Sequence, residues 1–141
     1  MKLIYRYFFS YILCGTAIHA APKLPNIVFL LADDQATISM GCYGNKDVLT
    51  PNLDGLSERG VTFDNHYVTT AICMASRATI LTGKYEYAHG CNFTKGKLGK
   101  RDFINSYPLL LRRAGYMTAF AGKFGVDLEG RDLPSDEFDR W

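Results

Sequence analysis

The sequence has little excess charge of either sign, few cysteines and no long apolar run. Its 16 lysine and arginine residues oppose 14 acidic residues among 141, which gives a formal net charge of +2. A dedicated nucleic-acid-binding protein usually shows a strongly basic surface, so this balance argues against one. The four cysteines are too few and too scattered for a disulfide scaffold or a paired-cysteine zinc site. With 48% hydrophobic residues, the composition is that of a globular chain of at most one domain.

The N-terminus has the pattern of a secretory signal peptide. Lys2 and Arg6 flank the start of an apolar run, and small residues follow it up to Ala20 and Ala21. The run is shorter than the ~20 residues that a stable membrane span needs. We therefore predict a signal peptide over residues 1–21, export to the periplasm or the outside of the cell, and no stable membrane span in the mature chain. The alternatives are an N-terminal anchor or a buried strand.

Segments with strand and helix patterns alternate along the rest of the chain. A continuous apolar run and two mixed segments predict strands at residues 26–32, 61–68 and 116–121. Three segments that start at capping residues, among them Thr50 and Ser106, or stop at glycines predict helices at residues 51–59, 73–82 and 107–114. Residues 84–105 show little periodicity and are expected to be loop. The alternation predicts an α/β fold, a mainly parallel sheet flanked by helices, with a site beyond the carboxyl ends of the strands.

Charged or nucleophilic residues follow three of these element boundaries. Asp33 and Asp34 come directly after the first strand, and two adjacent carboxylates suit a hard divalent cation. Cys73 begins the second helix, where free amides favour an anion, and Arg77 lies on the same helix face. Lys123 stands among glycines after the third strand, as a point charge for an oxyanion. Taken singly, these residues equally fit a polar turn, a buried cysteine, a surface ion pair and a solvated lysine.

In this order the segments resemble the sulfatases. Residues 26–34 resemble the opening strand of that family, and residues 50–63 resemble the segment that follows it. Residues 73–83 are similar to the family signature Cys-x-Pro/Ala-Ser-Arg…Leu-Thr-Gly, and residues 115–123 are similar to its second signature. Each block is modest alone, and the ordered set is specific. The resemblance runs from about residue 24 to the last residue.

The resemblance implies an alkaline-phosphatase-like α/β sandwich, with residues 22–141 as the N-terminal part of a sulfatase catalytic domain. It also implies hydrolysis of sulfate esters. In the family, a formylglycine-generating enzyme oxidises the signature cysteine to an aldehyde, whose hydrate attacks sulfur and later expels sulfate. The implied catalytic residues are Cys73, Arg77 and Lys123. The implied ligands of a divalent cation, calcium rather than magnesium, are Asp33, Asp34 and the modified Cys73.

The implied partners are a sulfated small molecule or a sulfated polysaccharide, together with the formylglycine-generating enzyme, and no nucleic acid. The choice among sulfate esters stays open. After export, Cys42 and Cys91 would meet an oxidising compartment, and whether they pair also stays open.

Three departures from the family pattern stand out. Ala75 replaces a commoner proline, an accepted variant, and Gly125 stands where the family usually carries a histidine two residues after the lysine. Sulfatases are also several times longer, with their remaining metal ligands downstream. We therefore expect a chain ending at Trp141 to be an N-terminal fragment, inactive by itself and with exposed apolar faces. Two alternatives remain: a phosphohydrolase or phosphotransferase of the same fold, and an inactive sulfatase remnant.

Overall fold

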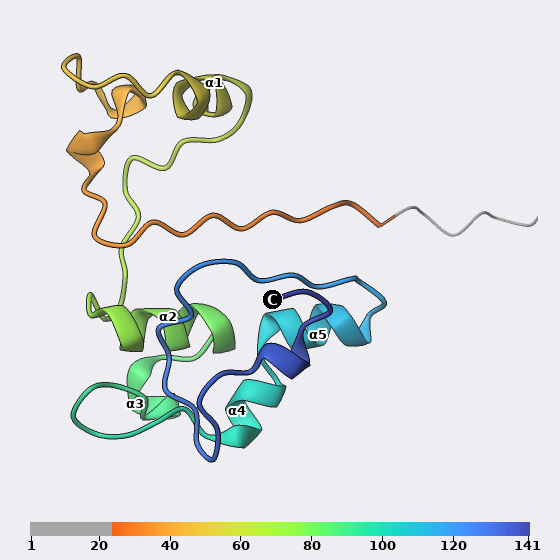
Figure 1. Ribbon diagram of the computed structural model, residues 1–141. Helices are drawn as coiled ribbons and strands as arrows, with labels where there is room; N and C mark the ends of the chain where they lie inside the picture. The colour runs from red at the N-terminus through yellow and green to blue at the C-terminus, as the bar shows by residue number, and fades with distance from the viewer. Residues whose placement is uncertain (1–23) are drawn as a thin grey trace, which may run out of the picture.

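The computed structural model describes residues 24–141, so the predicted signal peptide lies outside the described residues. Figure 1 shows two groups of elements, one with α1 and the short turns before it, the other with α2 to α5. The helices are α1 (Pro51–Arg59), α2 (Cys73–Thr82), α3 (Glu86–His89), α4 (Lys100–Ile104) and α5 (Tyr107–Arg113). Single turns of 3-10 helix form η1 (Thr37–Ser39), η2 (Gly41–Tyr43) and η3 (Ser135–Glu137).

The three helices predicted from sequence are confirmed as α1, α2 and α5, because local signals fix their ends. Proline stands in the first turn of both α1 and α5, where its missing N–H costs nothing. Gly83 ends α2 in the left-handed conformation with a φ of +67°, which glycine adopts without penalty.

The predicted side-chain caps are wrong. The Thr50 hydroxyl accepts a bond from the Gly41 amide and donates to the Asp54 carboxylate instead of capping α1. The Ser106 hydroxyl is buried without a hydrogen-bond partner. The loop predicted over residues 84–105 is also wrong in part, because α3 and α4 form there. They are four and five residues long, too short to show helical periodicity in the sequence.

The predicted parallel sheet is not confirmed within residues 24–141, where pairing is limited to isolated bridges. Residues 26–32 are extended but carry no ladder, and residues 61–68 are irregular. Within 116–121, the Phe120 amide donates to the Arg140 carbonyl at 3.0 Å, a parallel contact of one bridge. A strand is stable only when a neighbour satisfies its backbone.

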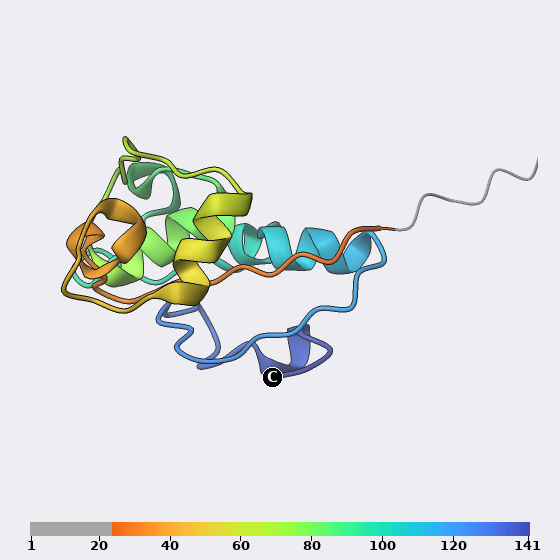
Figure 2. The same cartoon turned by 90° about the horizontal axis from the view of Figure 1, so that it is seen from above.

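The expected exposed apolar surface is present. Five large apolar side chains of the segment 26–32 are exposed, and Val28 reaches 80%. In both ribbon views this segment runs along α5, and the ring of Phe29 lies edge-on to that of Tyr107, with centroids 6.1 Å apart (Figures 1 and 2). The apolar pattern of residues 26–32 predicts a strand that is buried on both faces. Within the described residues this segment is in contact with other elements on one side only.

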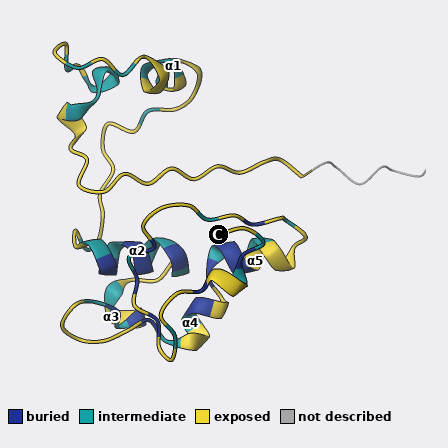
Figure 3. Cartoon of the chain, viewed as in Figure 1, coloured by how far each residue is buried: buried dark blue, intermediate teal, exposed yellow. Residues whose placement is uncertain are grey.

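The core lies between α2 and the segments that follow it. Figure 3 shows buried residues on α2, α3, α4 and α5 and none on α1. A single apolar cluster joins Met74, Ala78, Leu81, Cys91, Leu98, Phe103, Leu109, Phe124, Val126 and Leu128. The segment that carries Phe124 and Val126 is thus held against α2 by burial, and this fixes the position of Lys123 just before it.

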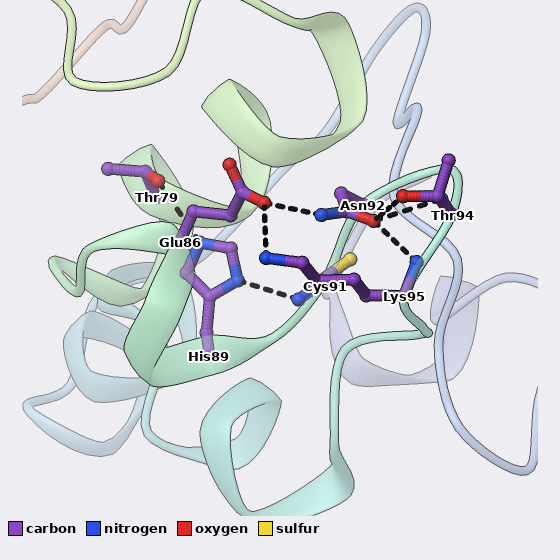
Figure 4. Close-up of polar contacts among 7 residues, drawn as sticks. All are labelled: Thr79, Glu86, His89, Cys91, Asn92, Thr94 and Lys95. Atoms are coloured by element: carbon purple, nitrogen blue, oxygen red, sulfur yellow. Dashed lines mark hydrogen bonds and ion pairs between the residues drawn. The ribbon is translucent and has the colours of Figure 1, made fainter.

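The His89 side chain links α3 to α2 through a hydrogen bond (Figure 4). Its ring Nδ1 accepts the Cys91 amide at 3.0 Å, so Nε2 carries the proton toward the Thr79 hydroxyl at 3.1 Å. Nearby, the Asn92 side-chain amide donates to the Glu86 carboxylate, and its Oδ1 accepts the amides of Thr94 and Lys95. These contacts give His89 a structural role.

Cys42, Cys73 and Cys91 are free thiols, so the described residues contain no Cys42–Cys91 disulfide. Burial raises the pKa of the Cys91 thiol. Among residues 24–141, no helix is both long enough and apolar enough to cross a bilayer.

Candidate functional site

A pocket of about 280 Å³ opens beside the first turn of α2. One wall is the chain that leaves the extended segment, with Asp33, Asp34 and Gln35. The facing wall is α2, with Cys73, Ser76 and Arg77, preceded by the end of the loop before it. The pocket therefore brings together the ends of two segments that the sequence separates by about 40 residues.

The first turn of α2 presents free backbone amides to this pocket. Cys73 is the first helical residue, and Ile72 before it makes no side-chain cap. The Ser76 amide is the first to bond back into the helix, to the Ile72 carbonyl at 2.8 Å. Amides that lack an intrahelical partner and the positive end of the helix dipole both favour a negatively charged group beside Cys73.

Arg77 is buried and crosses from α2 to the segment after Ala121. Only 9% of the residue is exposed. Its Nη1 donates to the Lys123 carbonyl at 2.7 Å, and its Nη2 lies 3.4 Å from Oδ1 of Asp33. A buried guanidinium needs partners for its N–H groups, and here Nη1 and Nη2 have partners on two different segments. Arg77 thereby holds the three segments of the site together.

Lys123 reaches the same carboxylate from the segment after Ala121. The chain turns at Gly122, whose φ is +98°, as expected from the glycines around the lysine. The Lys123 ammonium donates to Oδ2 of Asp33 at 2.6 Å. The hydrogen bond from Lys123 lowers the pKa of the Asp33 carboxyl, and the Asp33 carboxylate raises the pKa of the Lys123 ammonium.

Asp34 stands on the pocket wall with a φ of +55°, the only non-glycine residue in the described chain with a positive φ. Aspartate tolerates this left-handed conformation better than most residues.

The two carboxylates do not form a cation site by themselves. Both oxygens of Asp33 face cationic side chains. Residues 24–141 hold no cluster of three or more histidine, cysteine, aspartate or glutamate side chains able to bind a metal ion. Ca²⁺ takes about 6–8 oxygen ligands, and Mg²⁺ takes six in a strict octahedron. The described residues alone therefore do not fit the divalent cation that the resemblance implies.

The structure thus brings three of the five residues singled out from sequence, Asp33, Arg77 and Lys123, into one set of contacts. The other two, Asp34 and Cys73, line the pocket that Asp33 and Arg77 also line. Gly125 also belongs to this group, because an added Cβ there would lie 2.9 Å from Cδ of Arg77. The sequence marks Gly125 only as a departure from the family pattern. The one signal for its place was its spacing of two residues from Lys123.

Comparison with known proteins gives matches of one kind. The Sulfatase family model matches residues 25–141. An N-acetylglucosamine-6-O-sulfatase of Bacteroides thetaiotaomicron is 38% identical over 128 residues, which is 91% of this chain and 22% of that protein. An ulvan-active sulfatase of Formosa agariphila is 42% identical over 112 residues, 78% of this chain and 22% of that protein. Human arylsulfatase A is 37% identical over 123 residues, 82% of this chain and 24% of that protein.

The chain spans about a fifth of the length of the curated relatives it matches. The family match nonetheless includes every residue of the contact set at the pocket, from the strand-like segment to the turn that carries Lys123. Because the matching family model covers most of the chain and the relatives named above are sulfatases, this chain belongs to the sulfatase family.

Proposed function

We propose that this chain carries the part of a sulfate-ester hydrolase that binds the sulfate group, with Cys73, Arg77 and Lys123 as the residues that contact it. One observation carries the proposal. The two cationic side chains converge on the Asp33 carboxylate, which lines one pocket with Cys73, the first residue of α2 and the residue that matches the family nucleophile. A sulfate ester is a compact anion, and all of these groups attract negative charge.

Lys123 and Arg77 would act differently because they are held differently. The Lys123 side chain is more than half exposed and its ammonium can turn from Asp33 to a bound sulfate oxygen. Arg77 is fixed by burial and by the Lys123 carbonyl, so it would supply charge without moving. Charges that are already in place when charge develops on sulfate oxygens stabilise the transition state more than charges that must reorganise.

Cys73 is the proposed site of conversion to formylglycine by a formylglycine-generating enzyme. It is partly exposed at the start of a helix and faces the pocket, so its Cβ is directed toward the substrate space. When hydrated, the aldehyde carries two hydroxyls. One attacks sulfur as the alcohol leaves, and the C–O bond to sulfate then breaks as the second hydroxyl reforms the aldehyde, giving up its proton.

The proposal includes a divalent cation, calcium rather than magnesium. The described residues do not supply enough ligands for it, so further ligands would have to come from outside them. Asp33 and Asp34 would give two hard oxygen ligands. With a cation present, Lys123 and Arg77 would share the Asp33 carboxylate with it. No step assigned here to the residues of this chain depends on the cation.

Sulfated sugars are the proposed substrate class, with a sulfated small molecule as the alternative. Two relatives are named for sulfated saccharides, an N-acetylglucosamine sulfate and ulvan. Export to the periplasm or the outside of the cell, where such polymers are met, is proposed with it and rests on the signal-peptide pattern of residues 1–21.

The proposal is tested with the full-length protein co-expressed with a formylglycine-generating enzyme. Mass spectrometry of the Cys73 peptide should show the mass loss that accompanies replacement of CH₂–SH by an aldehyde. Release of sulfate from an aryl sulfate and from sulfated oligosaccharides is then measured. Lys123→Met should lower the rate by about 100-fold or more.

Lys97→Met is the matched control, since Lys97 is also exposed but, unlike Lys123, makes no ion pair within the described chain. It should leave the rate unchanged. Turnover of an aryl phosphate in place of the aryl sulfate would favour the phosphohydrolase alternative. An unmodified thiol together with no turnover of either ester would favour the inactive remnant.

A further inference from the structure

Gly125 lies between the stems of the two cationic side chains of the site. Its missing Cβ would stand 2.9 Å from Cδ and 3.1 Å from Nε of Arg77, and 3.4 Å from Cε of Lys123. Real Cβ atoms essentially never approach a heavy atom as closely as the first of these distances. The guanidinium of Arg77 therefore reaches the Lys123 carbonyl by passing over a bare backbone.

Arg77 has little freedom to yield. Its Cα is fixed in the middle of α2, and its Nη1 is held by the Lys123 carbonyl at 2.7 Å. The atoms that would meet a Cβ at residue 125 lie between these two anchors, in a side chain that is buried. Relief of the contact would require the anchored end to move, because a buried side chain has few alternative rotamers.

We propose that Gly125 is a positioning residue: the absence of a side chain there sets the path of Arg77 and hence the place of its guanidinium beside Asp33 and Lys123. In the backbone conformation that this chain adopts, a Cβ at position 125 would push Arg77 away from the Lys123 carbonyl. The catalytic consequence of this placement rests on the proposed sulfate-ester hydrolysis, whereas the placement itself does not.

The chain offers a matched control for the backbone conformation. Gly125 has a φ of +64° and Gly90 a φ of +65°, and an added Cβ at Gly90 meets nothing within 4 Å. Gly90→Ala therefore introduces the conformational strain of an alanine at positive φ without any new contact. Any effect of Gly125→Ala on the structure or on kcat/KM that exceeds the effect of Gly90→Ala can therefore be assigned to the contact with Arg77.

The experiment compares crystal structures of the full-length protein and of its two alanine variants. In Gly125→Ala the distance from Nη1 of Arg77 to the Lys123 carbonyl should exceed hydrogen-bonding range, whereas in Gly90→Ala the bond should persist. An Arg77 that keeps this bond in Gly125→Ala would overturn the proposal. This readout needs no turnover, so it stands even if the protein hydrolyses no sulfate ester.

Where the protein does turn over a sulfate ester, Gly125→Ala should lower kcat/KM by about 10- to 100-fold, the usual penalty for misplacing a reacting group by about 1 Å. Gly90→Ala should change it less than about twofold. In an Arg77→Ala background, Gly125→Ala should have no further effect, because the residue that it displaces is gone. An equal loss in both backgrounds would show that residue 125 acts by another route and would overturn the proposal.

Should Gly125→Ala fail to fold while Gly90→Ala folds, the double variant Arg77→Ala with Gly125→Ala decides the matter. Recovery of folded protein in the double variant would support a contact between these two residues as the cause. Failure to recover, with Arg77→Ala alone folded, would overturn it.

Discussion

Residues 24–72 and residues 73–141 are stabilised by different interactions, although both contain a helix predicted from sequence. In the second region, α2, α4 and α5 contribute buried side chains to one apolar cluster, and hydrogen bonds join segments far apart in the chain. In the first region, α1 buries no residue and packs chiefly against η2, the element before it in sequence. Local signals alone were enough to form α1, whereas burial fixes α2.

The site lies across the boundary between these two regions. Asp33 comes from the first region, and Cys73, Arg77 and Lys123 come from the second. The cationic residues are held by the core, since Lys123 immediately precedes buried Phe124 and Arg77 is itself buried. Asp33 is held chiefly by those two cations. The second region thus forms the rigid part of the site, and the first contributes a carboxylate to it.

The largest effect that would sharpen this comparison is expected in the core. Leu98 is fully buried, so Leu98→Ala should lower the free energy of unfolding by about 2–5 kcal/mol, through lost burial and the cavity left behind. Urea denaturation measures this. A loss below about 1 kcal/mol would mean that the cluster collapses around the gap and is not the rigid support described here.

A pH-dependent effect of intermediate size is expected at His89. Burial lowers the pKa of His89 below that of the unfolded chain, about 6.5, so the folded state binds the proton less readily. Stability should therefore be fully present above pH ~6.5 and should fall as the pH drops toward the lowered pKa, by at most about 1.4 kcal/mol per pH unit.

Urea denaturation of His89→Gln over this pH range should lack that part of the slope. An unchanged slope in His89→Gln would place the titrating group elsewhere.

A smaller effect is expected from the link between the two regions. Asp33→Asn removes both ion pairs to Lys123 and Arg77, and the midpoint of urea unfolding should shift much less than in Leu98→Ala, because the carboxylate is largely exposed to water. The shift should shrink further in 1 M salt, which screens exposed charges. A shift as large as that of Leu98→Ala would show that Asp33 is structural to the core region.

The smallest effect is expected on α1. Leu56 is 59% exposed, so Leu56→Ala should change the free energy of unfolding by no more than about 0.5 kcal/mol. The same urea denaturation, carried out on the full-length protein, is the measurement. A cost close to that of Leu98→Ala would show that other parts of the protein cover this helix, and the contrast between the two regions would then apply only to residues 24–141.

Elements whose signals are local could be predicted, and those that depend on a partner could not. Pro51 and Gly83 fix helix ends through their own backbone geometry, so α1 and α2 appear where the sequence places them. The apolar run at 26–32 indicates a strand, yet a strand also needs a neighbour, and residues 24–141 do not supply a ladder for it. The short helices α3 and α4 depend on burial of residues such as His89 and Phe103, which periodicity cannot show.

The sequence by itself determined the family, through an ordered set of short segments. It also determined the residue types at the site, because residue identity is a local property that needs no folded structure. Only the tertiary structure decided that Asp33, Arg77 and Lys123 meet, since they stand 44 to 90 residues apart and no local interaction links them. It also decided what Gly125 does. A missing side chain has a consequence only where another group, here Arg77, occupies the space that it leaves.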